Sequence, residues 1–425
     1  MDNNNFNPDF SQDFNGQTSI PDDNFNNINN NINNISNNRT YSQYNQNQSA
    51  SYAAYNQSGN GQFAAGSGYN PGFTPNNGYG SYQKPDFSIS SQDLEKFRER
   101  QRLNQQKEKL VKTANRIGLG LLLSQVIVLI GTFIATPFAV KIDYNSIDLS
   151  DIMGSVSFDV VSLYLLNAIM CLLGFGIAGI VITKLNRLRL DDVLIIKRTH
   201  FSDTVKLITA GMGFVFVFNL LLTLMNVNLS LFGYKNTMPD YGTPDNLLGY
   251  ILYFVSIAVV PPIIEEFIFR GAVLGSIRKL HGDTPAIIVS AALFGLAHAN
   301  FVQTPVTFLT GLVLGYLTVK TGSIIPSMIL HFLNNSIAVA GMFFEANNQH
   351  AFLLIDVGIT FAFIVFGLIS AKSLIKKYKN SLFVMENPAM DINMKQRLMA
   401  VFTAPWLIIF IIYSIIMCFM TAFSL

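Results

Sequence analysis

Long apolar runs dominate the chain from Ile117 onward, and they restrict its fold more than any other feature. A helix needs about 20 mainly apolar residues to cross a hydrocarbon core of about 30 Å. Nine segments approach or exceed this length: 117–140, 160–183, 205–229, 247–278, 285–301, 305–320, 323–344, 351–371 and 400–423. The fifth and sixth are short and could form a broken or re-entrant pair. The chain is therefore predicted to be an all-α, polytopic transmembrane helical bundle of about eight or nine spans, surrounded by membrane lipid.

The residues before the first span differ sharply in composition from the bundle. Residues 1–92 are rich in Asn, Gln, Gly and Tyr and cannot bury enough apolar area to offset the entropy of ordering, so they are predicted to be a disordered low-complexity tail. Residues 93–116 alternate basic and acidic side chains at helical spacing. This pattern predicts a charged juxtamembrane helix on an anionic cytoplasmic surface. The transmembrane bundle then occupies 117–425.

The distribution of Lys and Arg predicts the orientation of the spans. Basic residues cluster before the first span and after the second, fourth and eighth, as at Arg187, Lys279 and Lys376. The positive-inside rule then predicts a multi-pass protein of the cell membrane with a cytoplasmic N-terminus, and an odd number of spans would place Leu425 outside.

Charge and cysteine content exclude two other classes of function. The net charge of +2, without a basic stripe interleaved with aromatic residues, excludes nucleic acid as a partner. The two cysteines, Cys171 and Cys418, lie in apolar runs and can form neither a disulfide framework nor a Cys-type metal site.

Three ionisable residues lie deep inside the fourth span: Glu265, Glu266 and Arg270. Unpaired at a helix centre they would together cost about 8–10 kcal/mol. The eleven Leu, Ile, Val and Phe residues from 247 to 264 return only about 3–7 kcal/mol. These three side chains must therefore pair or line a polar cavity.

The spacing of the three residues divides them into a pair and a single group. Glu266 and Arg270 are four residues apart on one helical face and can form an ion pair. Glu265 is rotated by about 100° from Glu266 and is left to point elsewhere. Pro261 and Pro262, just upstream, release backbone groups and favour a kink beside these residues.

Two further spans carry polar side chains at matching depth, namely His298 in the fifth span and His331 with Asn335 in the seventh. At about 1.5 Å per residue, Glu265 lies about 21 Å from the basic end of its span at Lys279, and His298 lies about 21 Å from the same side at Thr284. His331 and Asn335 share a face of the seventh span. By the same estimate they lie about 12 and 18 Å from its start at Ser323. Three helices thus place polar groups in overlapping layers of the membrane, which predicts one converging site.

Three motifs in this region resemble those of the CAAX-protease and bacteriocin-processing (CPBP, or ABI) family of intramembrane proteases. They are Glu265-Glu266-x-x-x-Arg270, Phe294-x-x-x-His298 and His331-x-x-x-Asn335. Each motif is weak alone, but their order and their positions inside spans are family-like. The resemblance covers roughly residues 245–345, which would form the protease core.

The resemblance implies an endopeptidase in which Glu265 and His298 activate a water molecule. His331 and Asn335 would donate hydrogen bonds to the oxyanion, and the pair Glu266 and Arg270 would support Glu265. The substrate would be a membrane-associated peptide or lipidated protein. Some members of the family cut prenylated tails and others act on bacterial peptides; the Tyr/Asn-rich tail favours the second group. No cofactor is favoured, but Glu265, His298 and His331 could instead hold a catalytic zinc.

Three other interpretations of the same residues remain. A buried Glu–Arg pair and single His or Asn residues often serve only to hold helices together. Intramembrane Glu, Arg and His also occur along ion pathways, although the other spans lack the further ionisable groups expected of an ion-coupled transporter. A non-catalytic scaffold or bacteriocin immunity protein with this fold would carry the same motifs.

Overall fold

The computed structural model describes most of the chain after the low-complexity region. The described residues are 90–142, 156–194, 196, 200–231, 244, 246–347, 349–383, 385 and 391–423. The tail predicted for residues 1–92 therefore lies outside them, except for 90–92, where the first described helix begins.

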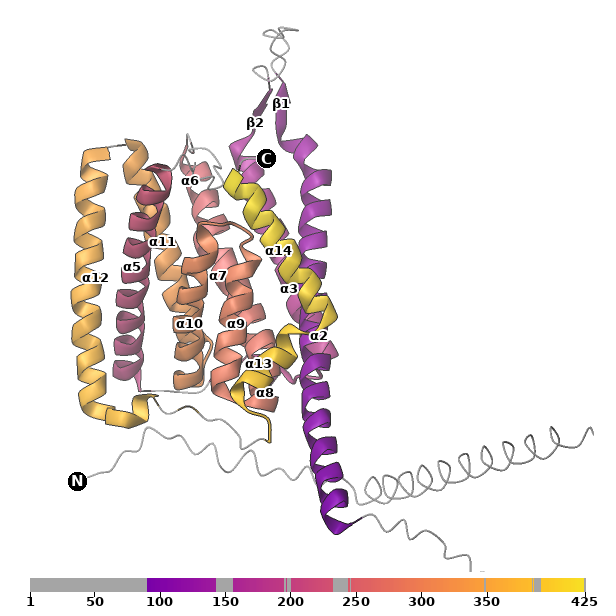
Figure 1. Ribbon diagram of the computed structural model, residues 1–425. Helices are drawn as coiled ribbons and strands as arrows, with labels where there is room; N and C mark the ends of the chain where they lie inside the picture. Colours follow the sequence, from indigo (N-terminus) through magenta and orange to yellow (C-terminus); the bar gives the residue numbers. More distant parts are fainter. Residues whose placement is uncertain are drawn as a thin grey trace, which may run out of the picture. The chain divides into compact units, whose positions relative to one another are not determined.

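The described chain is a bundle of helices, which confirms the predicted fold class (Figure 1). The helices are α2 Ser91–Ala139, α3 Val160–Leu185, α4 Leu190–Val193, α5 Phe201–Leu231, α6 Leu247–Phe254, α7 Val260–Glu266, α8 Leu274–His281, α9 Asp283–Ala297, α10 Gln303–Thr321, α11 Ile325–Asn347, α12 Gln349–Tyr378, α13 Met394–Phe402 and α14 Pro405–Phe423. Two π-helical segments, η2 Val255–Val259 and η3 Phe267–Val273, interrupt the line from α6 to α8, and a 3₁₀ turn, η4 Lys379–Phe383, follows α12.

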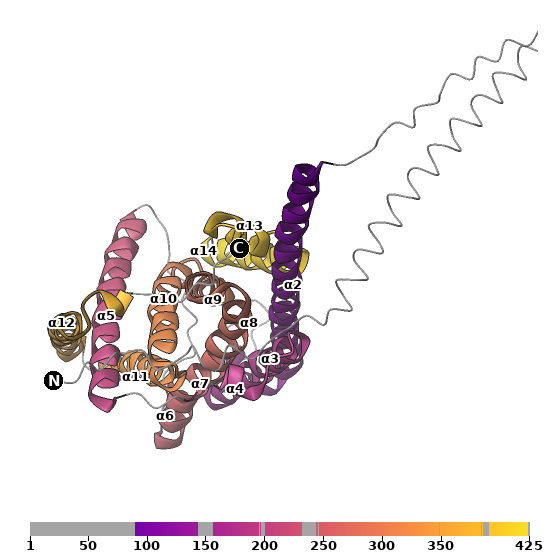
Figure 2. The same cartoon turned by 90° about the horizontal axis from the view of Figure 1, so that it is seen from below.

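The helices form a central group with a layer on each side. Viewed along the helices, the central group contains α6 to α11, with α5 and α12 on one side and α2, α3, α13 and α14 on the other (Figure 2). Within the central group, α9 packs on α10, α10 on α11, α11 on α7 and η2, and η3 back on α9. The segments that carry the candidate site are thus neighbours in space.

The protein is a multi-pass membrane protein. Seven described helices are long and apolar enough to cross a membrane, and Asp283–Ala297 is a shorter apolar helix. The predicted short pair corresponds to α9 and α10, of 15 and 19 residues. Exposed apolar side chains cover the outer faces of the bundle, as at Phe133, Phe361 and Leu368. Such side chains are suited to contact with lipid tails.

The charged segment 93–116 and the first span form one uninterrupted helix. At about 1.5 Å per residue, the 49 residues of α2 are more than twice as long as a hydrocarbon core of about 30 Å. The first turns of α2 therefore project past the ends of the neighbouring helices (Figure 1). Its packing against the bundle begins near Leu110, which is fully buried.

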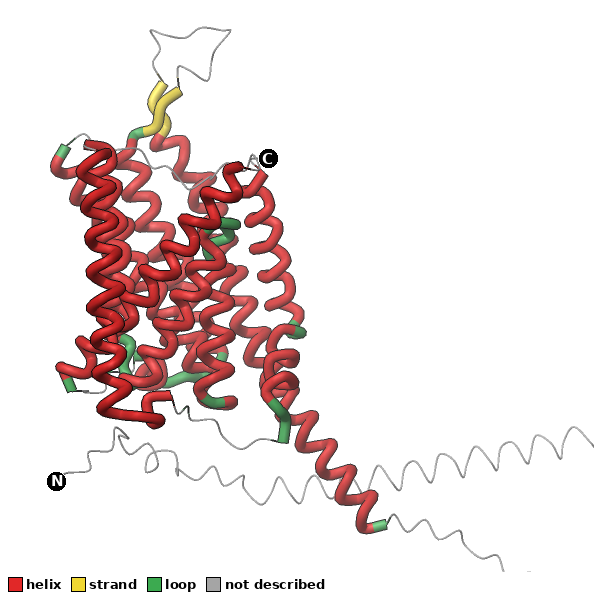
Figure 3. The backbone as a smooth tube through the Cα atoms, turned by 60° about the vertical axis from the view of Figure 1, so that its left-hand side comes forward, coloured by secondary structure: helices red, strands yellow, loops and turns green. Residues whose placement is uncertain are grey.

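Two details of the predicted segments are wrong. The last segment does not run from 400, because α13 ends at Phe402 and a new helix starts at Pro405; the residue before a proline avoids the helical region. In addition, an all-α chain without strands was predicted, but the described residues include a short strand pair. Residues Val140–Ile142 (β1) and Val156–Phe158 (β2) pair as a short antiparallel ladder between the end of α2 and the start of α3 (Figure 3).

A short polar contact holds the base of this hairpin. Asp159 caps α3 by accepting the Ser162 N–H, and its carboxylate also accepts from Lys141 Nζ at 2.6 Å. The Lys141 ammonium and the Ser162 hydrogen bonds hold the pKa of the Asp159 carboxyl at about 2. Asp159 is therefore ionised at neutral pH.

Candidate active site

The predicted site residues come from three neighbouring stretches of the central group. Glu265 and Glu266 end α7, Arg270 lies in η3, His331 and Asn335 lie on α11, and His298 caps the C-terminus of α9. The short helix α7 is held between two π-helical segments. These wider turns occur mostly as single insertions in α-helices, often at functional sites.

Glu266 and Arg270 form the ion pair expected from their spacing. Arg270 Nη1 donates to Glu266 Oε1 at 2.8 Å, and both side chains are completely buried. Arg270 Nη2 also donates to the Gly311 carbonyl at 3.3 Å, and the guanidinium lies 4.4 Å from the centre of the Phe294 ring. A buried guanidinium needs such multiple partners, because a single ion pair rarely repays the desolvation of both charges.

His331 connects the two glutamates. Its Nδ1 lies 3.0 Å from Glu266 Oε1, and its Nε2 lies 3.7 Å from Glu265 Oε2. Glu266 is fully buried, whereas the Glu265 side chain keeps 14% of its surface exposed. Glu265 is therefore the carboxylate that a bound molecule could reach.

The charges of this cluster do not balance when His331 is neutral. Two carboxylates, Glu265 and Glu266, lie near one guanidinium, that of Arg270, and the Glu266 and Arg270 side chains are completely buried. Buried unpaired charge is costly, so one additional proton on the cluster would neutralise it. His331 is the residue that contacts both carboxylates.

The Phe294 ring joins the two histidines and the arginine. It makes edge contacts with His298 at 4.9 Å and with His331 at 5.7 Å, besides its contact with the Arg270 guanidinium. Phe294 is almost completely buried and also packs against Phe269. The aromatic residue of the second motif thus fixes the relative positions of the polar groups.

His298 lies at the end of α9, where the backbone turns away. Its Nδ1 lies 2.9 Å from the Phe294 carbonyl, and the next residue, Ala299, has a positive φ of 49° that ends the helix. If Nδ1 carries the proton that this carbonyl accepts, Nε2 presents a lone pair. The described contacts place His298 against Phe294, while the imidazole that contacts Glu265 is that of His331.

Asn335 makes a backbone contact that the sequence prediction did not include. Its Nδ2 donates to the Ile257 carbonyl at 3.0 Å, and its Oδ1 accepts from Asn334. In a regular helix the Ile257 carbonyl would be bonded by residue 261, which is a proline without an N–H. Asn335 therefore replaces a missing helical donor. A primary amide has two N–H groups, so this bond still leaves a second donor on Asn335.

The site residues do not form an obvious metal-binding group. Among the described residues no three His, Cys, Asp or Glu side chains are arranged to hold one ion. Both ring nitrogens of His331 already face carboxylates, and His298 Nδ1 faces a carbonyl. A zinc ion held by Glu265, His298 and His331 would bind the Nε2 atoms of the two rings, because their Nδ1 atoms face Glu266 and the Phe294 carbonyl.

Sequence reasoning missed two polar residues that bond to the helix carrying the glutamates. Asn167 of α3 donates to the Ser256 carbonyl at 3.1 Å, and the hydroxyl of Ser290 in α9 donates to the Phe269 carbonyl at 2.7 Å. Both lie inside apolar runs, and a polar residue in such a run is a signal that could have identified them.

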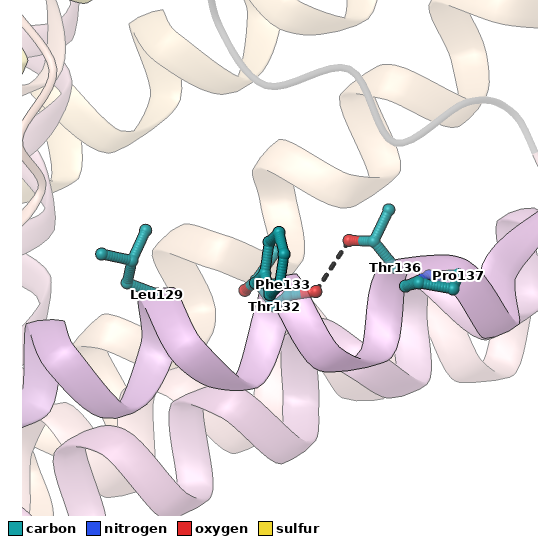
Figure 4. A pocket seen from close by; sticks show the side chains of 5 residues that line it. All are labelled: Leu129, Thr132, Phe133, Thr136 and Pro137. Carbon is teal, nitrogen blue, oxygen red and sulfur yellow. Dashed lines mark hydrogen bonds between the residues drawn. The ribbon is translucent and has the colours of Figure 1, made fainter.

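A shallow depression on α2 lies apart from these residues (Figure 4). It has a volume of about 410 Å³ and is lined by Leu129, Thr132, Phe133, Thr136 and Pro137. All five residues belong to one helix and none is ionisable. The depression is therefore a feature of the apolar outer surface.

Comparisons with known proteins match the part of the chain that contains the site. Residues 247–337 match the family described as type II CAAX prenyl endopeptidase Rce1-like. Over 94 residues, 21% of this chain, the sequence is 31% identical to the membrane-embedded CAAX protease MroQ of Staphylococcus aureus (strain USA300). The aligned segment covers 37% of that protein. No solved structure matches the chain.

Proposed function

Residues 247–337 belong to the CAAX-protease (CPBP) family of membrane endopeptidases, and from this premise we propose that the chain is an intramembrane endopeptidase. It would cleave a peptide bond near the C-terminus of, or within, a membrane-associated peptide or lipidated protein. The observation that carries this proposal is the contact of His331 with both Glu265 and Glu266. Together with Arg270, these residues assemble a buried acid–base cluster from two helices at one depth.

Glu265 is the proposed general base. It is the only one of the two glutamates with exposed surface, and Glu266 is held by Arg270 and His331. Glu265 and the Nε2 of His298 would hold a water molecule, and Glu265 would take one of its protons as the oxygen adds to the scissile carbonyl. The same proton would then pass to the leaving nitrogen as the C–N bond breaks. The products are a carboxylate and an amine.

His331 and Asn335 are the proposed oxyanion donors. A protonated His331 would donate its Nδ1–H to Glu266 and direct its Nε2–H toward Glu265. The distance of 3.7 Å between His331 Nε2 and Glu265 Oε2 allows one oxygen atom to contact both groups. This state also balances the charges of Glu265, Glu266 and Arg270. The second N–H of the Asn335 amide would complete the oxyanion site.

The metal-free mechanism is preferred to a zinc mechanism because of the contacts of the histidines. In a catalytic zinc site three side chains present their lone pairs to one point. Among the described residues, His331 contacts Glu265 while His298 contacts the Phe294 carbonyl, and no three His, Cys, Asp or Glu side chains are gathered around one point.

Comparison of peptides released from membranes tests the proposed function. Membranes containing the wild-type chain, Glu265→Gln or His298→Ala would be analysed by mass spectrometry at equal protein abundance. We expect fragments that occur only with the wild-type chain. Identical peptide profiles would contradict the protease and support a non-catalytic scaffold or immunity protein of the same fold.

The orientation of the protein in the cell membrane is part of the same proposal. Basic residues of α8, α12 and α13 lie at the end of the bundle where α2 begins, and α14 ends at the opposite end (Figure 1). The positive-inside rule places the basic end in the cytoplasm. The substrate's bond would then be cleaved inside the bilayer between these two ends.

A further inference from the structure

Pro261 and Pro262 deprive two consecutive carbonyl groups of their helical donors. The Ile257 carbonyl would be bonded by residue 261 in an α-helix and by residue 262 in a π-helix, and both are prolines without an N–H. For the Ser256 carbonyl the corresponding residues are Val260 and Pro261. The Val260 N–H is directed to the Val255 carbonyl instead. Neither carbonyl is therefore bonded in the α or π register.

Side-chain amides from two different helices replace these missing donors. Asn335 of α11 donates to the Ile257 carbonyl, and Asn167 of α3 donates to the Ser256 carbonyl at 3.1 Å. Ser256 is almost fully buried, so water is a poor substitute for the amide. A carbonyl left without a donor in hydrocarbon is costly, which ties η2 to both neighbours.

The second π-helical segment is tied to a third helix. The Phe269 carbonyl accepts the N–H of Leu274, five residues further on, and also the hydroxyl of Ser290 at 2.7 Å. Ser290 is completely buried in α9, one turn before Phe294. The hydroxyl therefore links η3 to the helix that ends in His298.

We propose that Asn167 and Ser290 are positioning residues for Glu265 and Glu266. The two glutamates end a seven-residue helix, α7, whose rotation about its axis depends on the π turns at both of its ends. Asn167 fixes the turn before α7, and Ser290 fixes the turn after it. Together they hold Glu265 toward His331 at 3.7 Å without touching a substrate. The expected effect of these residues on catalysis rests on the proposed function, whereas their effect on the orientation of α7 does not.

Two variants with matched controls separate positioning from general packing. Asn167→Leu removes the amide that donates to the Ser256 carbonyl, and Ser290→Ala removes the hydroxyl that donates to the Phe269 carbonyl, each with little change of shape. Thr183→Val on α3 and Ser124→Ala on α2 serve as controls, because within the described part of the chain these hydroxyls donate to carbonyls of their own helices, Gly179 and Leu121. If the proteins cleave a peptide, both test variants are expected to lower kcat about 10- to 100-fold with little change in KM. The controls should retain kcat.

A distance measurement tests the inference without relying on cleavage. Spin labels at Ile263→Cys on α7 and Phe361→Cys on α12, both exposed positions, would be placed in a chain with Cys171→Ala and Cys418→Ala. In nanodiscs, both test variants should shift or broaden the distance distribution relative to the two controls. An unchanged distribution would overturn the inference, as would a changed distribution with wild-type kcat. A wild-type protein that cleaves nothing would contradict the proposed function, while the distances would still decide whether these residues orient α7.

Discussion

His331 Nδ1 lies 3.0 Å from Glu266 Oε1, the same oxygen that accepts from Arg270. Glu266 is thus bonded from two helices and is fully buried, whereas its neighbour Glu265 is partly exposed. Adjacent residues of one helix therefore have different environments. This difference supports a structural role for Glu266 and a chemical role for Glu265.

Loss of the buried ion pair should lower the stability of the folded protein more than loss of a more exposed pair. Arg270→Met leaves the Glu266 carboxylate buried without its cation, which typically costs about 3–5 kcal/mol. Lys279→Met is the matched control, because its pair with Asp192 is partly exposed, with 47% of the lysine and 23% of the aspartate side chain accessible, and should contribute only about 1 kcal/mol. Thermal unfolding in detergent micelles measures both. Equal unfolding temperatures for the two variants would show that the buried pair contributes no more to stability than the more exposed pair.

The double variant Glu266→Gln with Arg270→Met extends this test. Because neither charge is then buried alone, it should be more stable than Arg270→Met by itself. A double variant as unstable as the single one would mean that the loss comes from packing around Phe294.

Asn335 should have separable effects on stability and on activity. Asn335→Leu removes the donor to the Ile257 carbonyl and should destabilise the protein by about 1–3 kcal/mol. Pro261→Ala restores a backbone N–H for that carbonyl, so the stability cost of Asn335→Leu should shrink in the Pro261→Ala background. Activity should not recover, because the proposed oxyanion donor is still missing. Unfolding and cleavage would be measured on all four members of this cycle.

The Asn335 cycle also tests the assigned role of the residue. Recovery of stability and activity together would indicate that Asn335 acts only by holding the helix. The oxyanion role would then be wrong.

Removal of metal ions should leave the activity unchanged. In the proposed mechanism Glu265 itself takes the proton from water, so no metal ion is needed to activate it. The purified protein would be treated with a tight chelator, dialysed and assayed with and without added zinc. Loss of cleavage after chelation, followed by recovery with zinc, would replace the metal-free mechanism by a zinc mechanism through Glu265, His298 and His331.

The two ends of the bundle should be reachable from opposite sides of the membrane. Lys395→Cys lies at the start of α13, and Lys141→Cys lies in the hairpin at the other end; both positions are exposed. With Cys171 and Cys418 buried, an impermeant maleimide added to intact cells should label position 141 and leave 395 unlabelled until the cells are opened. The reverse pattern would invert the proposed orientation.

Much of the site could be predicted because helical geometry is local. The spacing of Glu266 and Arg270 was sufficient to predict their ion pair, and depth along each helix placed His331 near the glutamates. Which side chain contacts which depends on the rotation of whole helices, and the sequence of one helix does not determine it. The contact of His331 with both glutamates could therefore not be predicted, nor the contact of His298 with the Phe294 carbonyl.

The backbone contacts could have been predicted only in part. Pro261 and Pro262 signal carbonyls without donors, and the sequence reasoning used them to predict a kink. The structure accommodates them with a π-helical segment and the amides of Asn167 and Asn335. The identity of those partners follows from tertiary packing. The hairpin of β1 and β2 was missed because each strand has only three residues, below the length at which alternation is visible.

Cleavage by the purified protein in liposomes tests the central claim most directly. The substrate would be a membrane peptide that the wild-type chain releases, and Glu265→Gln would be compared with wild type at equal folded amounts. Because Glu265 makes only the long contact to His331 among the described ion pairs, Glu265→Gln should keep the unfolding temperature within a few degrees of wild type. Its cleavage rate should fall by about 10²-fold or more. Cleavage by Glu265→Gln at the wild-type rate would contradict the assignment of Glu265 as the base that activates water.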